Sequence, residues 1–463
     1  MKRRDFFRKG AIASAGIGLL SGYNTAMAAE VIDAKKKAKN IIFLVSDGMS
    51  SGTLNMADLY ARRKFGRDSH WINLYKENKI KRALMDTASL NSAVTDSAAG
   101  GSSWGGGYRV NNGSLNVGPN GEEYKPILQK FKDAGKKVGC VTTVPITHAT
   151  PASFCINHKT RNAQPIIAEK YIDLKFDVMM GGGAEHFKKQ KREDGKDMFQ
   201  KFSEAGYTVL QTKKAWENAD TNKPVLGVFY ENGLPYTLDH LQDKELIENI
   251  PTLAEMTQFA IDAMKNHPEG FVMQVEGGKV DWAAHANDAS AIINDQIAFD
   301  DAVKTAIDFA EKDGETLIII TTDHGNANPG LVKGKKADEN FDKFLNFKHT
   351  NEWVLFQLNQ QSSVKEIIET FEFAQSTVLS KEDAQLIKNH YAKMKDEELY
   401  NPYKLPFHQV AEIQEKYTNV GWACGDHTGD FVELAMFGPG SNQLLPFVKN
   451  TDLHYFMLEV AEV

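Results

Sequence analysis

Cysteine is scarce in this sequence. Only three of the 463 residues are cysteine, Cys140, Cys155 and Cys424, and no two of them have C-x-x-C spacing. Dense, even sets of cysteine are typical of disulfide-stapled domains, and closely spaced pairs are typical of thiolate metal sites. The sequence therefore argues against both, although an oxidising compartment would permit one bridge. We expect all three thiols to be small buried residues and none to be a metal ligand.

An excess of positive charge is also missing. The chain has 54 Lys and Arg against 61 Asp and Glu, a net charge of −7, and no basic stripe interleaved with aromatic residues. A nucleic-acid-binding surface normally shows a basic excess, so we expect none. Hydrophobic residues make up 42% of the chain, and Gly and Pro are spread along it without low-complexity tracts. This composition is typical of a folded globular protein.

The sequence has no hydrophobic run long enough to cross a bilayer. The apolar run "AIASAGIGLL" covers residues 11–20, whereas a transmembrane helix needs about 20 apolar residues. This run follows the basic "MKRRDFFRKG" and precedes a small-residue cleavage site after Ala28, which predicts a signal peptide over residues 1–28. Arg3-Arg4 favours the twin-arginine export machinery, and an ordinary secretory signal is the alternative. We expect a periplasmic or secreted protein without a membrane anchor.

Short apolar runs rich in β-branched residues recur along the chain, and each ends in a polar or glycine-rich corner. Between them lie helical patterns such as "YKPILQKFKDAG" and "AFDDAVKTAIDFAEKDG". This alternation predicts an α/β fold with a mostly parallel central sheet flanked by helices. The runs are "NIIFLV", "KVGCVTTVP", "FDVMMG", "FVMQVE", "TLIIITT" and "FVELAMF".

Two segments interrupt this pattern. Residues 36–330 are predicted to form the main α/β domain, with a mixed insertion at about 162–267, and residues 423–463 to return to it. Residues 331–422 are predicted to be a mainly helical insertion, because after the strand-like run "EWVLFQL" the apolar residues follow helical periodicity. Ser380 and Asp383 are spaced as a helix capping box.

Polar side chains stand at the carboxyl ends of the predicted strands. In open parallel sheets the functional site lies beyond these ends. The candidates are therefore Asp47, Thr150, Glu276, Asp281, Asp323 and His324.

Asp281 and His285 lie four residues apart in "KVDWAAH". If this segment is helical, both side chains share one face and can hold one metal ion. Taken alone, the pair also fits a solvated acid near a surface histidine.

An Asp-His dipeptide, Asp323-His324, ends the very apolar run "TLIIITT". A carboxylate beside a buried strand needs a partner or a metal, although a capping role is the alternative. Asp47 follows the first strand and His427 precedes the last, where a helix cap and an ordinary loop histidine are the alternatives. Together these oxygen and nitrogen donors suit zinc, with no cysteine required.

Ser97, in "NSAVTDSAAGGSSW", is an unusual candidate nucleophile. It lacks the G-x-S-x-G elbow and has no histidine nearby in the sequence, so its activating partner must come from elsewhere. The glycines after it disfavour helix by about 1 kcal/mol each relative to alanine. We therefore expect a short helix with Ser97 near its N-terminus, where backbone N–H groups favour an anion.

These motifs together resemble the alkaline phosphatase family. The order "SDG", "TDSAA", "HATPASF", "VEGGKVDWAAH", "TTDH" and "DHTG" matches the family from about Asn40 to the C-terminus. The resemblance implies hydrolysis of phosphate monoesters, with release of inorganic phosphate, through a phosphoserine on Ser97 and with Arg161 clamping the phosphate. It implies one zinc ion on Asp281, His285 and His427, a second on Asp47, Asp323, His324 and Ser97, and a magnesium ion on Asp47, Thr150 and Glu276.

The implied roles agree with general chemistry. Zinc lowers the pKa of bound water to about 7, and the same Lewis acidity would hold a serine as an alkoxide. Zinc would thus replace the missing base of Ser97. A guanidinium binds two phosphate oxygens in a planar fork, which suits Arg161 to its role.

Two residues depart from the best-studied enteric bacterial enzyme. His148 stands in place of an aspartate and Trp282 in place of a lysine, as in some marine and cold-adapted bacterial members. Residues just behind metal ligands tune metal affinity, so we hypothesise a weaker or more exchangeable third metal. The alternative for both residues is simple packing.

The motifs argue against three other functions. A phosphodiesterase of the same superfamily commonly uses threonine, and a sulfatase needs a C/S-x-P-x-R setting, so Ser97 with Arg161, Thr150 and Glu276 argues against both. A non-catalytic metal-binding protein would not need a serine between two zincs. Small-molecule phosphomonoesters are the expected partners. The family includes homodimers and monomers, so the oligomeric state stays open.

Overall fold

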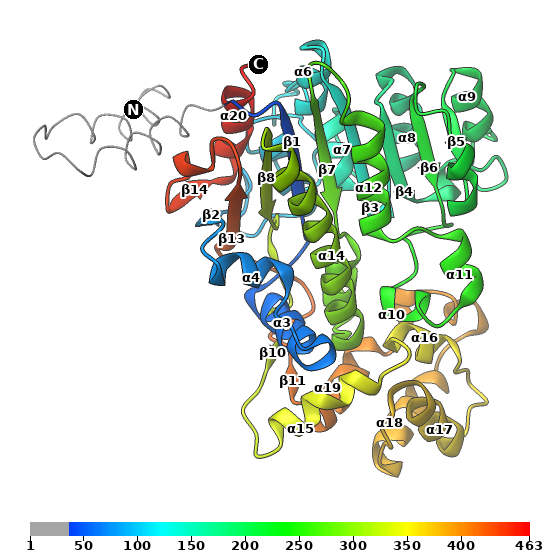
Figure 1. Cartoon of the computed structure of the whole chain (residues 1–463). Coiled ribbons are helices and arrows are strands. Elements are labelled where there is room, and N and C mark those ends of the chain that lie inside the picture. The colour runs from blue at the N-terminus through cyan, green and yellow to red at the C-terminus, as the bar shows by residue number, and fades with distance from the viewer. Residues whose placement is uncertain (1–36) are drawn as a thin grey trace, which may run out of the picture.

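The computed structural model describes residues 37–463, so the predicted signal peptide lies outside the described residues. A ten-stranded sheet forms the centre of the molecule, in the order β14-β2-β13-β8-β1-β7-β3-β4-β6-β5 (Figure 1). All neighbouring strands pair in parallel except β13, which is antiparallel to both β8 and β2. The prediction of a mostly parallel α/β sheet is confirmed.

The six predicted apolar runs all form strands of this sheet. They are β1 (Asn40–Val45), β3 (Lys137–Pro145), β4 (Val178–Gly182), β7 (Phe271–Glu276), β8 (Thr316–Thr321) and β13 (Val432–Phe437). The remaining strands are shorter or more exposed and lie toward the two edges: β2 (Lys81–Asp86), β5 (Thr208–Leu210), β6 (Val225–Val228) and β14 (Phe447–Lys449).

The central strands are buried on both faces. Along β1, Ile42 and Leu44 belong to one apolar cluster, whereas Ile41, Phe43 and Val45 belong to the cluster on the opposite face. This period-two alternation into two cores explains why the run is apolar throughout.

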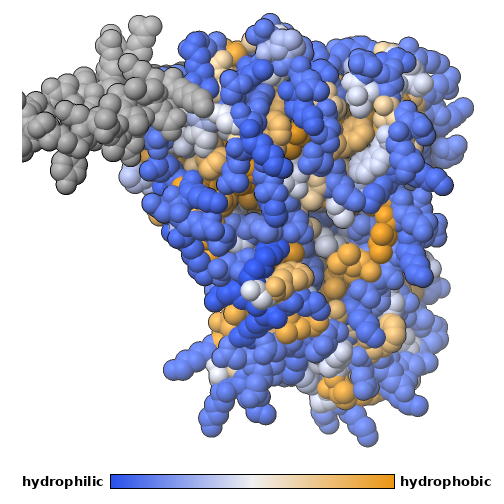
Figure 2. All heavy atoms as spheres, viewed as in Figure 1, coloured by the Kyte–Doolittle hydropathy of each residue, from blue (hydrophilic) through white to orange (hydrophobic). Residues whose placement is uncertain are grey.

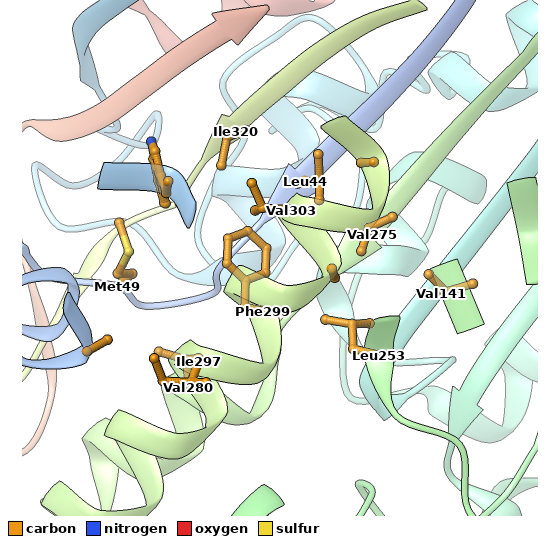
Figure 3. Packing of buried hydrophobic residues seen from close by; sticks show 14 of the residues in the cluster. Leu44, Met49, Val141, Leu253, Val275, Val280, Ile297, Phe299, Val303 and Ile320 are labelled. Atoms are coloured by element: carbon orange, nitrogen blue, oxygen red, sulfur yellow. The ribbon is translucent and has the colours of Figure 1, made fainter. Parts of the chain in front are cut away.

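One layer of helices covers the first face. Figure 3 shows Leu44, Val275 and Ile320 gathered around Phe299 and Val303 of the long helix α14. Six helices that precede β8 in the chain contribute buried residues to this cluster: α3 (Ser51–Phe65), α4 (His70–Lys76), α10 (Thr237–His240), α12 (Leu253–Met264), α13 (Lys279–His285) and α14 (Ala289–Asp313). Phe341 of α15 (Ala337–Phe341), from the later helical segment, joins it as well. Helix α11 (Lys244–Asn249) lies at its margin.

A second layer covers the other face. Its helices are α5 (Ser97–Gly105), α6 (Ile127–Asp133), α7 (Ala149–Cys155), α8 (Gln164–Leu174), α9 (Met198–Glu204) and α20 (Asn450–Val460). Helix α5 packs on α7 and α20.

The segment 331–422 is mainly helical and builds an apolar cluster of its own, below the sheet in Figure 1. Its helices are α15 (Ala337–Phe341), α16 (Asn351–Phe356), α17 (Val364–Gln375), α18 (Lys381–Tyr391) and α19 (Phe407–Thr418). Ser380 caps α18 by accepting a hydrogen bond from the Asp383 backbone N–H, as its spacing predicts. The division of the chain into a main domain and insertions stays a prediction.

The prediction that "EWVLFQL" forms a strand is wrong, because most of this run lies in helix α16. The Thr350 side chain caps the helix by accepting from the Trp353 backbone N–H. Val354 and Leu355 then pack among apolar residues of α17, α18 and α19, with no sheet neighbour. A short apolar run does not distinguish a buried helix from a buried strand. Here the Thr350 cap favours the helix.

The cysteine prediction is confirmed for two residues and wrong for one. Cys140 and Cys155 are buried free thiols whose sulfur atoms lie 3.6 Å apart. Cys424 is exposed, because it lies in a loop outside the apolar clusters.

The face in Figure 2 is mostly hydrophilic, with scattered apolar side chains. Among residues 37–463, no helix combines the length and the apolarity that crossing a bilayer would require.

Candidate functional site

The candidate side chains meet at the carboxyl ends of three neighbouring strands. The strand register places Val45 beside both Glu276 and Thr321, so β1, β7 and β8 end level with one another. Asp47 and Asp323 each lie two residues beyond their strands and are buried. The strand ends thus bring together residues that lie hundreds of positions apart in the sequence.

Ser97 begins helix α5 and faces this cluster. Its Oγ lies 3.5 Å from Asp47 Oδ1 and 3.3 Å from His324 Nε2, and the residue is only 1% exposed. Asp96 caps the helix by accepting from the Ala99 backbone N–H. The predicted short helix with Ser97 at its N-terminus is confirmed.

Asp281, His285 and His427 form one possible metal site. The two histidine Nε2 atoms lie 3.1 Å apart. Each also lies 3.5 Å from a carboxylate oxygen of Asp281. Asp281 and His285 share a face of α13, which confirms the predicted helix.

Backbone groups orient both histidines of this site. His285 Nδ1 lies 3.1 Å from the carbonyl oxygen of Gly425, and His427 Nδ1 lies 2.9 Å from that of Thr95. A histidine that donates one ring N–H to a carbonyl presents its other nitrogen, with a fixed direction, to a metal. Both Nε2 atoms are therefore available to one ion.

Asp47, Asp323 and His324 form a second possible site, fully buried, with ligand atoms within 4.8 Å of one another. His324 Nε2 lies 3.5 Å from Asp47 Oδ1 and 3.2 Å from Asp323 Oδ2. Burial and the Asp323 charge raise the pKa of Asp47 well above its usual range. Burial, with the charge of Asp281, raises the pKa of Asp323 to about 6.

A third group surrounds the other oxygen of Asp47. Thr150 Oγ1 donates to Asp47 Oδ2 at 3.2 Å, and Thr142 donates to Glu276 Oε2. Burial raises the pKa of Glu276 to about 8. His148 also lies within ligand range of Asp47 and Glu276. Sequence reasoning placed His148 only behind the ligands.

These residues fit divalent cations. Among residues 37–463, Asp323 Oδ2 and Glu276 Oε1 are buried without any hydrogen-bond partner. Buried carboxylates that repel one another are costly unless a cation or a proton compensates them. The mixed nitrogen and oxygen donors of the first two sites suit zinc, whereas the oxygen-rich third group suits magnesium.

Arg161 is held beside the start of α5. Its guanidinium donates to Asp96 Oδ2 at 3.2 Å and to His148 Nε2 at 3.1 Å. Burial, together with the Arg161 charge, lowers the pKa of His148 to about 3, so the ring is a neutral acceptor. The Trp282 ring meets the His148 ring edge-on, with centroids 6.0 Å apart.

Sequence reasoning missed two polar residues of the site. Asn326 donates to Asp281 Oδ1 at 2.7 Å, and the pairing of β9 (Gly325–Asn326) with β12 (His427–Thr428) places it there. Asp426 lies within ligand range of His285 and His427. The Asp426-His427 dipeptide repeats the Asp-His pattern of 323–324, which was a usable signal.

Comparison with known proteins gives a consistent result. The family model described as alkaline phosphatase matches residues 38–463. The chain is 31% identical over 433 residues to alkaline phosphatase 4 of Bacillus subtilis, covering 90% of this chain and 87% of that protein.

Solved structures agree. The crystal structure of Thermus thermophilus alkaline phosphatase superposes with a TM-score of 0.84 at 30% identity, covering 96% of this chain and 95% of that one. A further match is an alkaline phosphatase variant from the Antarctic bacterium TAB5, with a histidine replaced by glutamate and magnesium bound in the M3 site. Its TM-score is 0.65 at 23% identity, covering 92% and 99%.

Proposed function

The chain belongs to the alkaline phosphatase family and is a phosphomonoester hydrolase, and from this premise we propose that it works through a phosphoserine intermediate on Ser97. The observation that carries the proposal is the position of Ser97 Oγ, 3.5 Å from Asp47 and 3.3 Å from His324 at the start of α5. A buried serine hydroxyl beside carboxylate and imidazole groups that could bind metal is well placed for a chemical role.

The reaction has two displacements. The Ser97 oxygen attacks phosphorus, the bond from phosphorus to the substrate's alcohol oxygen breaks, and the alcohol leaves with a proton. Water then attacks the phosphoserine, inorganic phosphate leaves and the Ser97 hydroxyl is restored. Zinc, when bound by these residues, would supply Lewis acidity that favours the alkoxide form of Ser97.

We assign the metal ligands as the sequence predicts. Asp281, His285 and His427 would hold one zinc ion, and Asp47, Asp323 and His324, with Ser97, a second. Asp47, Thr150 and Glu276 would hold magnesium.

The third metal is proposed to be held weakly. An imidazole is a poor magnesium ligand, because magnesium prefers hard oxygen donors. His148 brings such a ring beside Asp47 and Glu276. The TAB5 variant, in which a carboxylate replaces a histidine and magnesium occupies the M3 site, supports this idea.

Phosphate binding is assigned to Arg161 and the start of α5. The guanidinium forms a planar fork that matches two phosphate oxygens, and Asp96 and His148 hold it in place. The free N–H groups at a helix N-terminus add a favourable site for an anion. Both features bind the phosphoryl group of the substrate and leave its alcohol part free to vary.

We also propose that the protein acts outside the cytoplasm, in the periplasm or the medium. The predicted signal peptide over residues 1–28 supports this, and the twin-arginine pair favours export of the folded chain.

The test is replacement of Ser97 by alanine. We expect the Ser97→Ala protein to fold and to retain zinc, and to lose at least about 10³-fold in turnover of p-nitrophenyl phosphate. Ser103→Ala is the matched control, since Ser103 lies in the same helix and donates only to the Ala99 carbonyl. Metal analysis and a diester assay, before and after chelation, complete the experiment. Unchanged turnover in Ser97→Ala would exclude the phosphoserine mechanism, and preference for the diester would exclude monoester specificity.

A further inference from the structure

Lys279 has an unusual environment for a lysine. It begins α13 and is only 4% exposed. Its ammonium nitrogen lies 3.5 Å from the ring centroid of Tyr236 and 4.8 Å from that of Trp282. Within residues 37–463 the ammonium makes neither a hydrogen bond nor an ion pair within 4.0 Å, so its closest interactions are with two aromatic rings.

Negative charges surround this aromatic cage at longer range. The carboxylates of Glu352, Asp295, Asp239 and Asp288 all act on Lys279 electrostatically. Burial lowers the pKa of Lys279, and these carboxylates oppose that shift. The attraction between a cation and the face of an aromatic ring is stronger in a desolvated site than at the protein surface. The Lys279 ammonium therefore attracts both rings, the Tyr236 ring at the shorter distance.

Trp282 is confined on other sides as well. Lys279 and Trp282 are three residues apart on α13 and so share a helix face. A Cβ atom on Gly233 would lie 2.8 Å from the Trp282 ring and 3.3 Å from the Lys279 side chain. A side chain at Gly233 would therefore fit only if the indole ring shifted, so this loop confines the ring on one side.

The confined ring in turn borders the residue that holds Arg161. Trp282 meets His148 edge-on, and His148 Nε2 accepts a hydrogen bond from the Arg161 guanidinium at 3.1 Å. A shift of Trp282 would release the His148 ring, and with it one of the two groups that orient the guanidinium.

We propose that Lys279 is a positioning residue for phosphate binding: by holding Trp282 against His148, it fixes the orientation of Arg161. This inference rests on the proposed role of Arg161 in binding phosphate. The competing role for Lys279 is structural, since its charge also balances Asp295 of α14 and Glu352 of α16 and so joins the helical segment to the sheet domain.

A double-mutant cycle separates the two roles. Lys279→Met and Lys279→Arg are made in the native protein, and Lys279→Met also in an Arg161→Ala background. The dissociation constant of inorganic phosphate is measured by calorimetry on each protein as purified with its metals. KM and kcat for p-nitrophenyl phosphate, zinc content and the unfolding midpoint are measured on the same samples.

Positioning predicts a specific pattern. Lys279→Met should raise the phosphate dissociation constant and KM by about 5-fold, a change typical of losing one such contact, with little change in kcat. Lys279→Arg should restore most of the affinity, because a guanidinium also stacks on aromatic rings. In the Arg161→Ala background Lys279→Met should have almost no effect, because the group that it positions is gone. Lys244→Met, on the exposed start of α11, is the matched control and should change nothing.

A structural role predicts no interaction between the Lys279 and Arg161 substitutions. Equal fold-losses from Lys279→Met with and without Arg161 would overturn the proposal, and so would unchanged phosphate affinity. If Lys279→Met does not fold, Gly233→Ala takes its place in the cycle, since its methyl group would displace Trp282 and leave the charge intact. The proposed function is tested separately, by Ser97→Ala and by Arg161→Ala alone, whereas the Lys279 claim depends on the interaction between two substitutions.

Discussion

At the scale of single residues, the buried carboxylates define what the site can bind. Asp47, Asp323 and Glu276 all have raised pKa values because burial disfavours their ionised forms. A bound divalent cation reverses this preference, since it stabilises the carboxylates. Metal binding should therefore release protons, and acid should weaken it as these groups are protonated.

His148 is the residue for which metal preference can be changed most directly. We expect the double variant His148→Asp, Trp282→Lys to bind magnesium about 10-fold more tightly, because a carboxylate would join Asp47 and Glu276. Magnesium titration by calorimetry, with the inhibition constant of phosphate measured in parallel, checks this. Equal magnesium affinity and equal phosphate inhibition in the two proteins would contradict a role for these residues at the third metal.

Much of the geometry of the candidate site could be predicted from the sequence at this scale. Asp47, Glu276, Asp323 and His324 were found because polar residues at the ends of parallel strands converge. Asn326 was not found, because its hydrogen bond to Asp281 depends on the pairing of β9 with β12, two residues each. The cage around Lys279 was not found either, since Tyr236 reaches it from a separate loop.

At the scale of elements, the glycines of α5 allow close packing against α7, although glycine disfavours helix formation. A Cβ atom on Gly101 would lie 2.3 Å from Ser153 Oγ, and one on Gly105 would lie 2.0 Å from the Ser153 carbonyl oxygen. Glycine thus lets α5, which carries Ser97, pack directly on α7, which carries Thr150. Close backbone contact, and not intrinsic helix propensity, sets the position of Ser97, the proposed nucleophile.

Gly105→Ala tests this contact. We expect the variant to lose about 1–3 kcal/mol of unfolding free energy, because the methyl group overpacks the contact with α7, and to lose kcat as Ser97 shifts. Gly330→Ala is the matched control, since a Cβ atom there meets nothing within 4 Å. Urea unfolding and p-nitrophenyl phosphate turnover are the measurements. Equal stability of the two variants would show that α5 and α7 do not need glycine between them.

Secondary structure was predictable where the pattern was long or strongly buried. Helix α14 and the strands β1, β3, β7 and β8 follow from apolar periodicity and apolar runs. The strand prediction for "EWVLFQL" is wrong because seven apolar-rich residues fit either a strand or a helix, and the Thr350 side chain caps the helix that forms.

At the scale of the whole molecule, the site depends on the topology of the sheet. Strands β13, β8, β1, β7 and β3 are neighbours, and their connections bring Asp47 and His427 to one place from opposite ends of the chain. The fold class was predictable because alternating strands and helices leave few arrangements. The order of the ten strands was not predictable, since it depends on packing between residues far apart in the sequence.

The most direct measurement is mass spectrometry of the protein after it is mixed with a phosphomonoester and quenched in acid. The account predicts that the peptide containing Ser97 gains the mass of one phosphoryl group, that fragmentation places it on Ser97, and that the gain is absent from Ser97→Ala. A peptide that stays unmodified while the enzyme turns over, or a phosphoryl group on another residue, would contradict it.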